Sequence, residues 1–455
     1  MRHPSRAKTP LKFPINLTRR DFLTICGAAA GAFSLRRGFA QPARGAATGS
    51  PPLETFTQWL AASRQARQAA LQPTLDRIAD LDRSIHAWRQ VQPQPRTGDG
   101  PLAEIPFGVK DIIETKGLST EYGSAIYQGR IGTEDAAIVR LMRARGGILL
   151  GKTHTTAFAY REPSPARNPR NLEHTPGGSS SGSAAAVAAG MVPVAIGTQT
   201  RGSVLRPASF CGVTGFKTTY GLLPMEGVLP YARSFDTLGF FTHTAADMLA
   251  FWGAMGQPTG QTEDFAFAAP DPLPDVEPEM RAAFAATLER LRRAGLAIRR
   301  VDLAGLLVAL DAASSVVAFY EGARFHEARY KEFGERMGPM GALVRDGLQI
   351  PAAKYEEARR TIADGRARVT EIYKSTPVIL VPAAPGPAPK GLSTTGDPRM
   401  NSPWTAVGTP AISIPMPISE GLPLGLQLTA GLGEDARVIR AAVRLERMLT
   451  DKATA

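Results

Sequence analysis

Serine, glycine and lysine residues in three segments of the chain could together perform nucleophilic chemistry. Segments 177–190 and 197–217 combine serine with many glycines, and segment 105–111 places Lys110 after the apolar run Ile-Pro-Phe-Gly-Val. Glycine lets backbone amides approach a ligand closely, and consecutive amides in such a turn can bind an anion. A serine hydroxyl is a weak nucleophile that must pass its proton to a base. The three segments therefore indicate nucleophilic catalysis by a serine.

Lys110 is the candidate base in this arrangement. Because an apolar run precedes it, we expect it to be buried, and burial lowers the pKa of a lysine by disfavouring the charged amine. A fall from about 10.4 to about 7 corresponds to about 4.6 kcal/mol, which burial can supply. A second serine could carry the proton from the nucleophile to Lys110.

The histidines offer no better base and no metal site. Their spacing is not typical of metal ligands, so we expect neither a metal nor a cofactor. The chain has six of them, namely His3, His86, His154, His174, His243 and His326.

Two short motif matches suggest other chemistry. Residues 146–153 match the phosphate-loop pattern, but their centre is Ile-Leu-Leu, which predicts a buried strand and not a polar loop around phosphate. Residues 178–182 match the G-x-S-x-G elbow of α/β-hydrolases, which would make Ser180 the nucleophile with His243 or His326 as its base. That elbow needs a strand before it, whereas His-Thr-Pro-Gly precedes this match, so it remains an alternative.

The order and spacing of the three segments resemble those of the amidase signature enzymes. The resemblance implies a Ser–cis-Ser–Lys triad with Lys110 as the base, Ser179 as the proton relay and Ser203 as the nucleophile. It also implies a cis peptide bond between Gly178 and Ser179. The resemblance covers most of the chain and includes four further segments, at residues 151–153, 234–239, 382–385 and 421–427.

The same resemblance implies an oxyanion hole made of backbone amides, from Thr200, Arg201, Gly202 and Ser203. Arg201 and Ser181 stand where this family usually has glycine. If position 201 needs a positive φ, arginine is strained there, and its side chain could narrow the site or attract an anionic substrate. We predict substrate contacts from Ser180 and from Arg206, a candidate for carboxylate recognition. Either arginine could instead pair with a structural acid or carbonyl.

Composition and patterning predict a single α/β domain. The 455 residues are 43% hydrophobic and 21% charged, close to globular averages. Strands alternate with helices, which predicts an α/β fold. Together with the family resemblance, this implies an amidase domain over 54–455 with a large, mostly parallel or mixed sheet covered by helices on both faces. The expected elements are two helices over 54–91 broken near Pro73, strands at 105–113, 147–150, 410–416 and 423–429, helices at 134–145, 184–189 and 434–450, and a helical substrate-shaping region at 278–373.

The N-terminus resembles a removable export signal. Residues 19 and 20 are both arginine, a short apolar stretch follows at 22–35, and small residues allow cleavage after Ala40. This pattern is typical of the twin-arginine route to the bacterial periplasm. Residues 41–53 follow as a flexible lead-in. Without residues 1–40, which hold eight Lys/Arg and one acid, the net charge falls from +12 to +5, so nucleic-acid binding is not expected.

The two cysteines indicate no disulfide framework. Cys26 lies inside the signal, and Cys211 remains alone in an apolar setting typical of an inert, buried thiol. No apolar stretch of 18 or more residues occurs, which excludes a polytopic membrane protein, and we expect no membrane insertion once the signal is removed.

These observations predict a periplasmic amidase that hydrolyses a small carboxylic amide to a carboxylate and ammonia or an amine through a Ser203 acyl-enzyme. An esterase is an alternative, because the same acyl-enzyme forms from esters. A protein like the catalytic subunit of the tRNA-dependent amidotransferase is another alternative, which the export signal disfavours. A catalytically silent ligand-binding protein is an alternative of another class, and a homodimer is left open.

Overall fold

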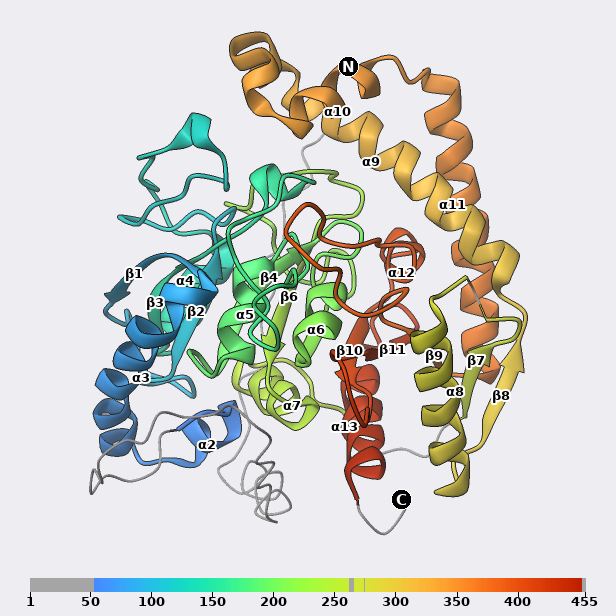
Figure 1. Cartoon of the computed structure of the whole chain (residues 1–455), viewed down its shortest axis with the longest axis horizontal. Coiled ribbons are helices and arrows are strands. Elements are labelled where there is room, and N and C mark those ends of the chain that lie inside the picture. The colour runs from blue at the N-terminus through green and yellow to red at the C-terminus, as the bar shows by residue number, and fades with distance from the viewer. Residues whose placement is uncertain (1–52, 262–265, 274, 452–455) are drawn as a thin grey trace, which may run out of the picture.

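The computed structural model describes residues 53–261, 266–273 and 275–451 (Figure 1). The predicted signal, Cys26 and the lead-in up to residue 52 lie outside these residues. One mixed sheet of eleven strands forms the centre, in the order β1-β3-β2-β4-β6-β5-β10-β11-β9-β7-β8. Its strands are β1 (Trp88–Gln94), β2 (Pro106–Lys110), β3 (Ile148–Thr153), β4 (Val194–Gln199), β5 (Thr214–Lys217), β6 (Thr237–Thr242), β7 (Phe267–Pro270), β8 (Ile298–Val301), β9 (Val378–Pro382), β10 (Ala411–Pro415) and β11 (Gly425–Ala430).

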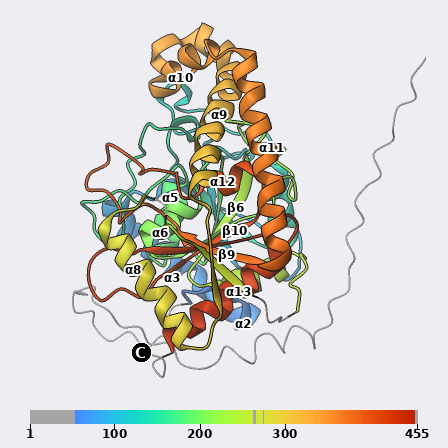
Figure 2. The same ribbon diagram turned by 90° about the vertical axis from the view of Figure 1, so that its right-hand side faces the viewer.

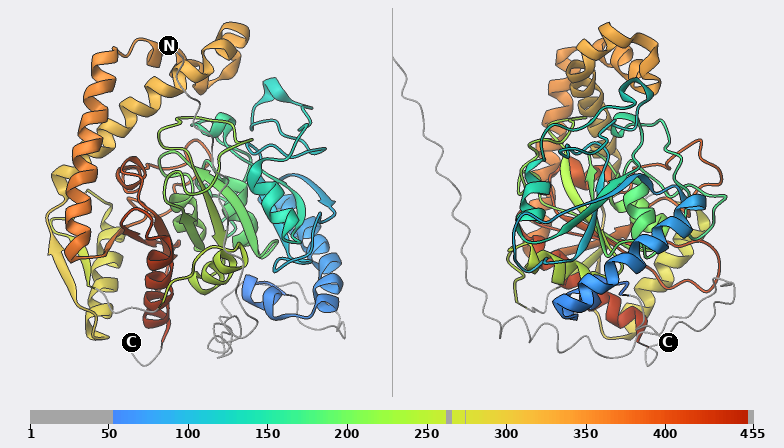
Figure 3. Two further views of the ribbon diagram at one scale, coloured as in Figure 1. Left: turned by 180° about the vertical axis from the view of Figure 1, so that it is seen from behind. Right: turned by 90° about the vertical axis from the view of Figure 1, so that its left-hand side faces the viewer.

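Helices cover both faces of this sheet, as predicted (Figures 1 and 3). β2 runs parallel to β3 and β4, and β7 runs parallel to β8 and β9, while the remaining neighbours are antiparallel. The helices are α2 (Phe56–Ala61), α3 (Arg64–Ile85), α4 (Ala137–Ala144), α5 (Ser181–Ala188), α6 (Leu205–Cys211), α7 (Ala245–Ala254), α8 (Pro278–Arg293), α9 (Ala304–Phe333), α10 (Pro339–Leu348), α11 (Ala352–Ser375), α12 (Ser402–Ala406) and α13 (Asp435–Thr450).

Side chains of the central strands point alternately to the two faces of the sheet, so the apolar core is divided into two clusters. On β6, Phe240 belongs to the larger apolar cluster, with α4, α7 and α13, whereas its neighbour Phe241 belongs to the smaller cluster, with α3, α5 and α6. On β4, Ile196 and Ala195 divide in the same way. Successive side chains of a strand point to opposite faces, so both faces of this sheet must be covered by apolar helices.

The predicted break near Pro73 is wrong, because α3 runs through this residue from Arg64 to Ile85. The chain breaks earlier, where the Ser63 side chain caps α3 by accepting a hydrogen bond from the Ala66 amide. Pro73 removes one backbone donor, but it is exposed, so water can satisfy the carbonyl left without a partner.

The expected helical region at 278–373 is present but also contains strand β8. Its helices α9, α10 and α11 arch over one side of the molecule, with α10 at the tip away from the sheet (Figures 1 and 2). By length and composition, residues 304–337 could cross a membrane, with a mean hydropathy of 1.4 in the most apolar window. Core helices of soluble proteins pass the same test. Here 33% of the window is buried, and α9 packs against α10, α11 and α12 and carries the buried polar side chains of Ser314 and His326.

Candidate active site

Lys110 lies fully buried at the carboxyl end of β2. Its Nζ is 2.7 Å from Ser179 Oγ, 2.8 Å from Thr198 Oγ1 and 3.4 Å from the Thr198 carbonyl oxygen. Burial holds the pKa of Lys110 well below its usual value, and the charge of Asp236 opposes this shift only in part. A neutral amine has two N–H donors and one lone pair, so it can donate twice to Thr198 and accept from Ser179. The site is therefore arranged for a lysine base.

Ser179 follows a cis peptide bond from Gly178 and lies just before α5. It is 3% exposed, and its carbonyl accepts a hydrogen bond from the Thr156 amide at 3.2 Å. A Cβ on Gly178 would come within 2.7 Å of Thr395 Cγ2, so a larger residue does not fit beside this bond. The local packing thus presents the Ser179 hydroxyl to Lys110.

Ser203 lies in the turn between β4 and α6. Its carbonyl accepts a hydrogen bond from the Ser180 amide at 3.4 Å, which brings this turn beside the segment that contains Ser179. Exposure increases from 0% at Lys110 to 3% at Ser179 and 9% at Ser203. The three residues therefore occupy one region, and Ser203 is the one that a substrate can reach most easily.

The turn that holds Ser203 offers four backbone amides to a ligand. None of the amides of Thr200, Arg201, Gly202 and Ser203 donates a hydrogen bond to another described residue. The next two amides, of Val204 and Leu205, donate to Gln199 Oε1 at 2.8 and 3.1 Å. Because a buried N–H needs an acceptor, free amides beside a serine are suited to a developing oxyanion.

Asp236 fixes the start of this turn. Its Oδ1 accepts from the Thr200 hydroxyl at 2.6 Å, and its Oδ2 accepts from the amides of Tyr231 and Ala232 at 2.8 and 3.1 Å. Burial raises the pKa of Asp236 to about 6, and these hydrogen bonds oppose the rise. No role for Asp236 was predictable from its local sequence, although it lies in segment 234–239 of the family resemblance.

The side chains predicted to contact substrate bond to the protein itself. The Ser180 hydroxyl donates to the Thr198 carbonyl at 3.2 Å. The Arg206 guanidinium donates to the carbonyls of Gly178 and Thr395 at 2.7 and 2.6 Å. Arg201 does not adopt a positive φ, so the strain considered for this position does not arise, and its guanidinium contacts Asp311. Arg201 and Arg206 thus both have structural partners, which is one of the two possibilities that the sequence left open.

The elbow alternative is not assembled in the described residues. Ser180 contacts neither His243 nor His326, and His326 Nε2 lies 3.2 Å from the Pro230 carbonyl. Burial lowers the pKa of His326 to about 3.

Cys211 is buried with a thiol whose pKa burial raises to about 12, which fits an inert side chain. No group of three or more His, Cys, Asp or Glu in the described chain is placed to hold a metal ion.

A side chain at Gly202 would force the neighbouring side chains to shift. A Cβ there would come within 2.6 Å of Asn401 Oδ1 and 3.0 Å of Arg206 Nη1. We expect Gly202→Ala to displace the turn and lower kcat by about 10²-fold, because small displacements of reacting groups have effects of this size. Steady-state kinetics would measure this loss. Gly305→Ala is the control, because a Cβ there meets nothing within 4 Å, and equal activity of the two variants would contradict the packing argument.

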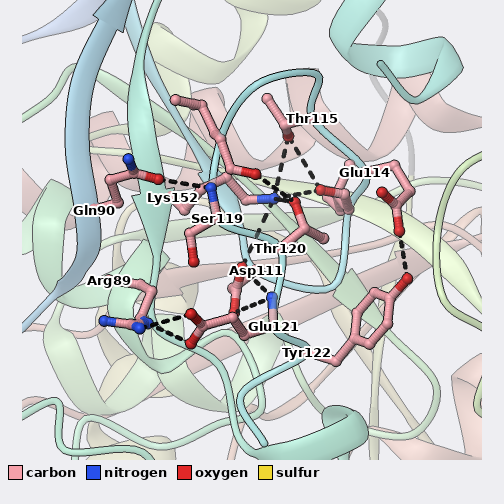
Figure 4. A network of polar contacts seen from close by, with 12 residues as sticks. Arg89, Gln90, Asp111, Glu114, Thr115, Ser119, Thr120, Glu121, Tyr122 and Lys152 are labelled. Carbon is pink, nitrogen blue, oxygen red and sulfur yellow. Dashed lines mark hydrogen bonds and ion pairs between the residues drawn. The ribbon is translucent and has the colours of Figure 1, made fainter. Parts of the chain in front are cut away.

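A buried polar network supports the loop that follows Lys110 (Figure 4). Lys152 on β3 donates to the Ile113 carbonyl and to Thr120 Oγ1, and its Nζ is 3.8 Å from Asp111 Oδ1. Burial lowers the pKa of Lys152 to about 8 and raises that of Asp111 to about 6. The buried strand predicted over 147–150 is confirmed as β3, which runs from 148 to 153, and its lysine has a structural partner in place of a phosphate.

We expect Lys152→Met to destabilise the fold by about 3–5 kcal/mol at pH 7.5, because it leaves the Asp111 carboxylate buried without its cation. The pKa of Asp111 is raised from 3.8 to about 6, so ionisation of this acid reduces stability as the pH rises through that range. The loss should therefore shrink at pH 5. Urea denaturation at the two pH values would measure it.

The double variant Lys152→Met/Asp111→Asn serves as the control for this prediction. It should recover part of the loss at pH 7.5, because no buried charge remains. A loss below 1 kcal/mol at pH 7.5, or one independent of pH, would contradict the role assigned to this pair.

Comparison with known proteins identifies the class. The family model described as Amidase matches residues 60–439. The A-subunit of glutamyl-tRNA(Gln) amidotransferase from Thermotoga maritima is 31% identical over 86% of this chain and 94% of its own length. Its crystal structure superposes with a TM-score of 0.74 at 29% identity over 86% of this chain and 94% of its own. The crystal structure of an amidase superposes with a TM-score of 0.77 at 28% identity over 85% of this chain and 98% of its own.

The fold and site thus define an enzyme that cleaves C–N bonds of amides. The chain belongs to the amidase family, as the resemblance in the sequence indicates.

Proposed function

We propose that this enzyme hydrolyses a small linear amide to a carboxylate and ammonia or an amine through an acyl-enzyme on Ser203. The observation that carries the proposal is the 2.7 Å contact between the buried Lys110 amine and the Ser179 hydroxyl. The turn with four free amides, which contains Ser203, lies beside it.

The chemistry follows from this arrangement. Neutral Lys110 accepts the proton of Ser179, Ser179 accepts that of Ser203, and Ser203 Oγ attacks the amide carbonyl. The turn amides stabilise the developing oxyanion, with each donor contributing about 3 kcal/mol. Ser179 then returns a proton to the leaving nitrogen as the C–N bond breaks. Water attacks the resulting ester by the same relay and releases the carboxylate and Ser203.

A test is the release of ammonia from simple primary amides by the purified chain alone. The similarity to the amidotransferase A-subunit favours a second candidate, ammonia transfer within a complex. Turnover without any partner supports the hydrolase. Turnover that appears only with partner subunits and an acceptor would support the transferase.

We also propose that the enzyme works in the periplasm after export by the twin-arginine route. The paired arginines Arg19 and Arg20, the apolar stretch and the Gly-Phe-Ala ending at 38–40, with small residues at 38 and 40, support this. Cell fractionation should find the protein in the periplasm and find Arg19→Lys/Arg20→Lys retained in the cytoplasm. Equal export of the two would contradict the proposal.

A further inference from the structure

The Arg201 side chain carries a positive charge into the turn that holds the nucleophile. It lies two residues before Ser203, and it is only 16% exposed. Its Nη2 is 2.5 Å from Asp311 Oδ1, whereas its Nε is buried without a hydrogen-bond partner. The only acid that contacts this guanidinium in the described residues therefore comes from α9, outside the strands and turns that form the site.

Asp311 is held in place for this contact. The Ser402 hydroxyl at the start of α12 donates to the same Oδ1. α12 also holds the backbone of the turn, because the Thr405 hydroxyl donates to the Arg201 carbonyl at 2.9 Å. Asp311 is thus fixed on both sides, by α9 and by α12, with its carboxyl group directed at Arg201.

The neighbouring part of α9 packs against an aromatic cluster. Phe319, two turns further along α9, packs its ring edge-on against Tyr160 at 6.0 Å between centroids, and Tyr160 packs against Tyr231 at 5.5 Å. Burial raises the pKa of Tyr160, and the charges of Arg161 and Arg201 oppose that rise. All three rings are uncharged at neutral pH.

We propose that Asp311 is a specificity-determining residue that masks the charge of Arg201, so that the enzyme takes amides with an uncharged, apolar acyl group. This inference rests on the proposed function. With the Asp311 carboxylate present, the ion pair is neutral overall, and a carboxylate on the acyl chain would meet Asp311 as well as Arg201. Without the Asp311 charge, the unpaired guanidinium of Arg201 would lie beside the nucleophile and attract such a carboxylate.

Two substrates of matched shape test the proposal. Glutaramate carries a carboxylate at the end of its acyl chain, and 5-methylhexanamide carries an isopropyl group of similar size there. The wild type should prefer the uncharged amide. Asp311→Asn removes only the charge, because an asparagine oxygen still accepts from Ser402 and Arg201. This variant should shift the ratio of kcat/KM toward glutaramate by about tenfold, which corresponds to about 1.4 kcal/mol.

Controls separate charge masking from general damage. Arg201→Met/Asp311→Asn should return the ratio to the wild-type value, because no cation is left to attract the carboxylate. Glu226→Gln neutralises an acid of an exposed ion pair with Arg140 and should leave the ratio unchanged. A gain for one substrate cannot arise from unfolding. An unchanged ratio in Asp311→Asn, or a shift that persists without Arg201, would overturn the proposal.

A binding measurement keeps this test independent of turnover. Calorimetry on Ser203→Ala, with and without Asp311→Asn, should show the same relative gain in affinity for glutaramate. No such gain would overturn the masking role, whatever the activity of the enzyme. Failure of the wild type to release ammonia from any amide, with the affinity gain present, would instead contradict only the proposed function.

Discussion

Replacement of Ser203 by alanine is expected to lower kcat for amide hydrolysis by at least about 10⁴-fold, because loss of a serine nucleophile has effects of this order or larger. The free energy of unfolding should change by less than about 1 kcal/mol, since the substitution removes one hydroxyl and leaves no cavity in the apolar core. Ammonia release under saturating amide, together with urea denaturation, would measure both quantities.

Ser180→Ala is the matched control for this prediction. The Ser180 hydroxyl bonds to the Thr198 carbonyl and lies in the G-x-S-x-G match. Its loss should reduce activity far less than the loss of Ser203. If Ser203→Ala kept full activity while Ser180→Ala lost it, the elbow alternative would replace the mechanism through Ser203.

Replacement of Lys110 by methionine is expected to lower kcat by about 10³-fold or more, within the range that a general base contributes. Activity of the wild type should fall as the pH decreases through the lowered pKa of Lys110, because the protonated amine cannot accept the Ser179 proton. The pH dependence of kcat/KM would show this fall, and the residual activity of Lys110→Met should lack it.

Lys110→Arg distinguishes a base from a fixed positive charge. Arginine keeps the charge but is not deprotonated in proteins, so this variant should be as inactive as Lys110→Met. Partial rescue by arginine would mean that the charge of Lys110 and not its lone pair is needed.

Titration of Lys110 also makes the free energy of unfolding depend on pH. Its pKa is lower in the folded state than the ordinary 10.5, so the unfolded chain binds the proton more tightly. The free energy of unfolding should therefore rise with pH between the folded pKa and about 10.5. Lys110→Met should lose this contribution to the slope, and an identical slope in both proteins would contradict the assigned burial.

The catalytic candidates could be predicted because each lies in a short sequence motif. Lys110 ends an apolar strand, and Ser179 and Ser203 sit in glycine-rich turns whose order along the chain indicates the family. The structure places them within one region, with the expected cis bond at Ser179. Their catalytic roles remain predictions for the experiments above.

The residues that hold this region together could not be predicted, because their partners are distant along the chain. Asp236 contacts Thr200 36 residues away, and Asp311 contacts Arg201 110 residues away. No local periodicity encodes such pairs. Gln199 was missed for another reason, since a polar residue at the end of a buried strand gives no sign that its amide will organise the following turn.

The strands and helices were likewise predictable only in part. The buried strands β2, β3, β10 and β11 were predicted from apolar patterning, whereas the buried strands β7 and β9 and the edge strands β1 and β8 were not. The edge strands lack the pattern on which such a prediction depends. Both are rich in glutamine or arginine and pair along one side only, so neither shows a clear apolar alternation.

Covalent labelling of the purified enzyme with a small fluorophosphonate, followed by peptide mapping, tests the central claim most directly. The proposed relay predicts a single adduct, on Ser203, that forms in the wild type and is lost in Lys110→Met. An adduct on Ser180 or another residue, or labelling of Ser203 at an undiminished rate without Lys110, would contradict it.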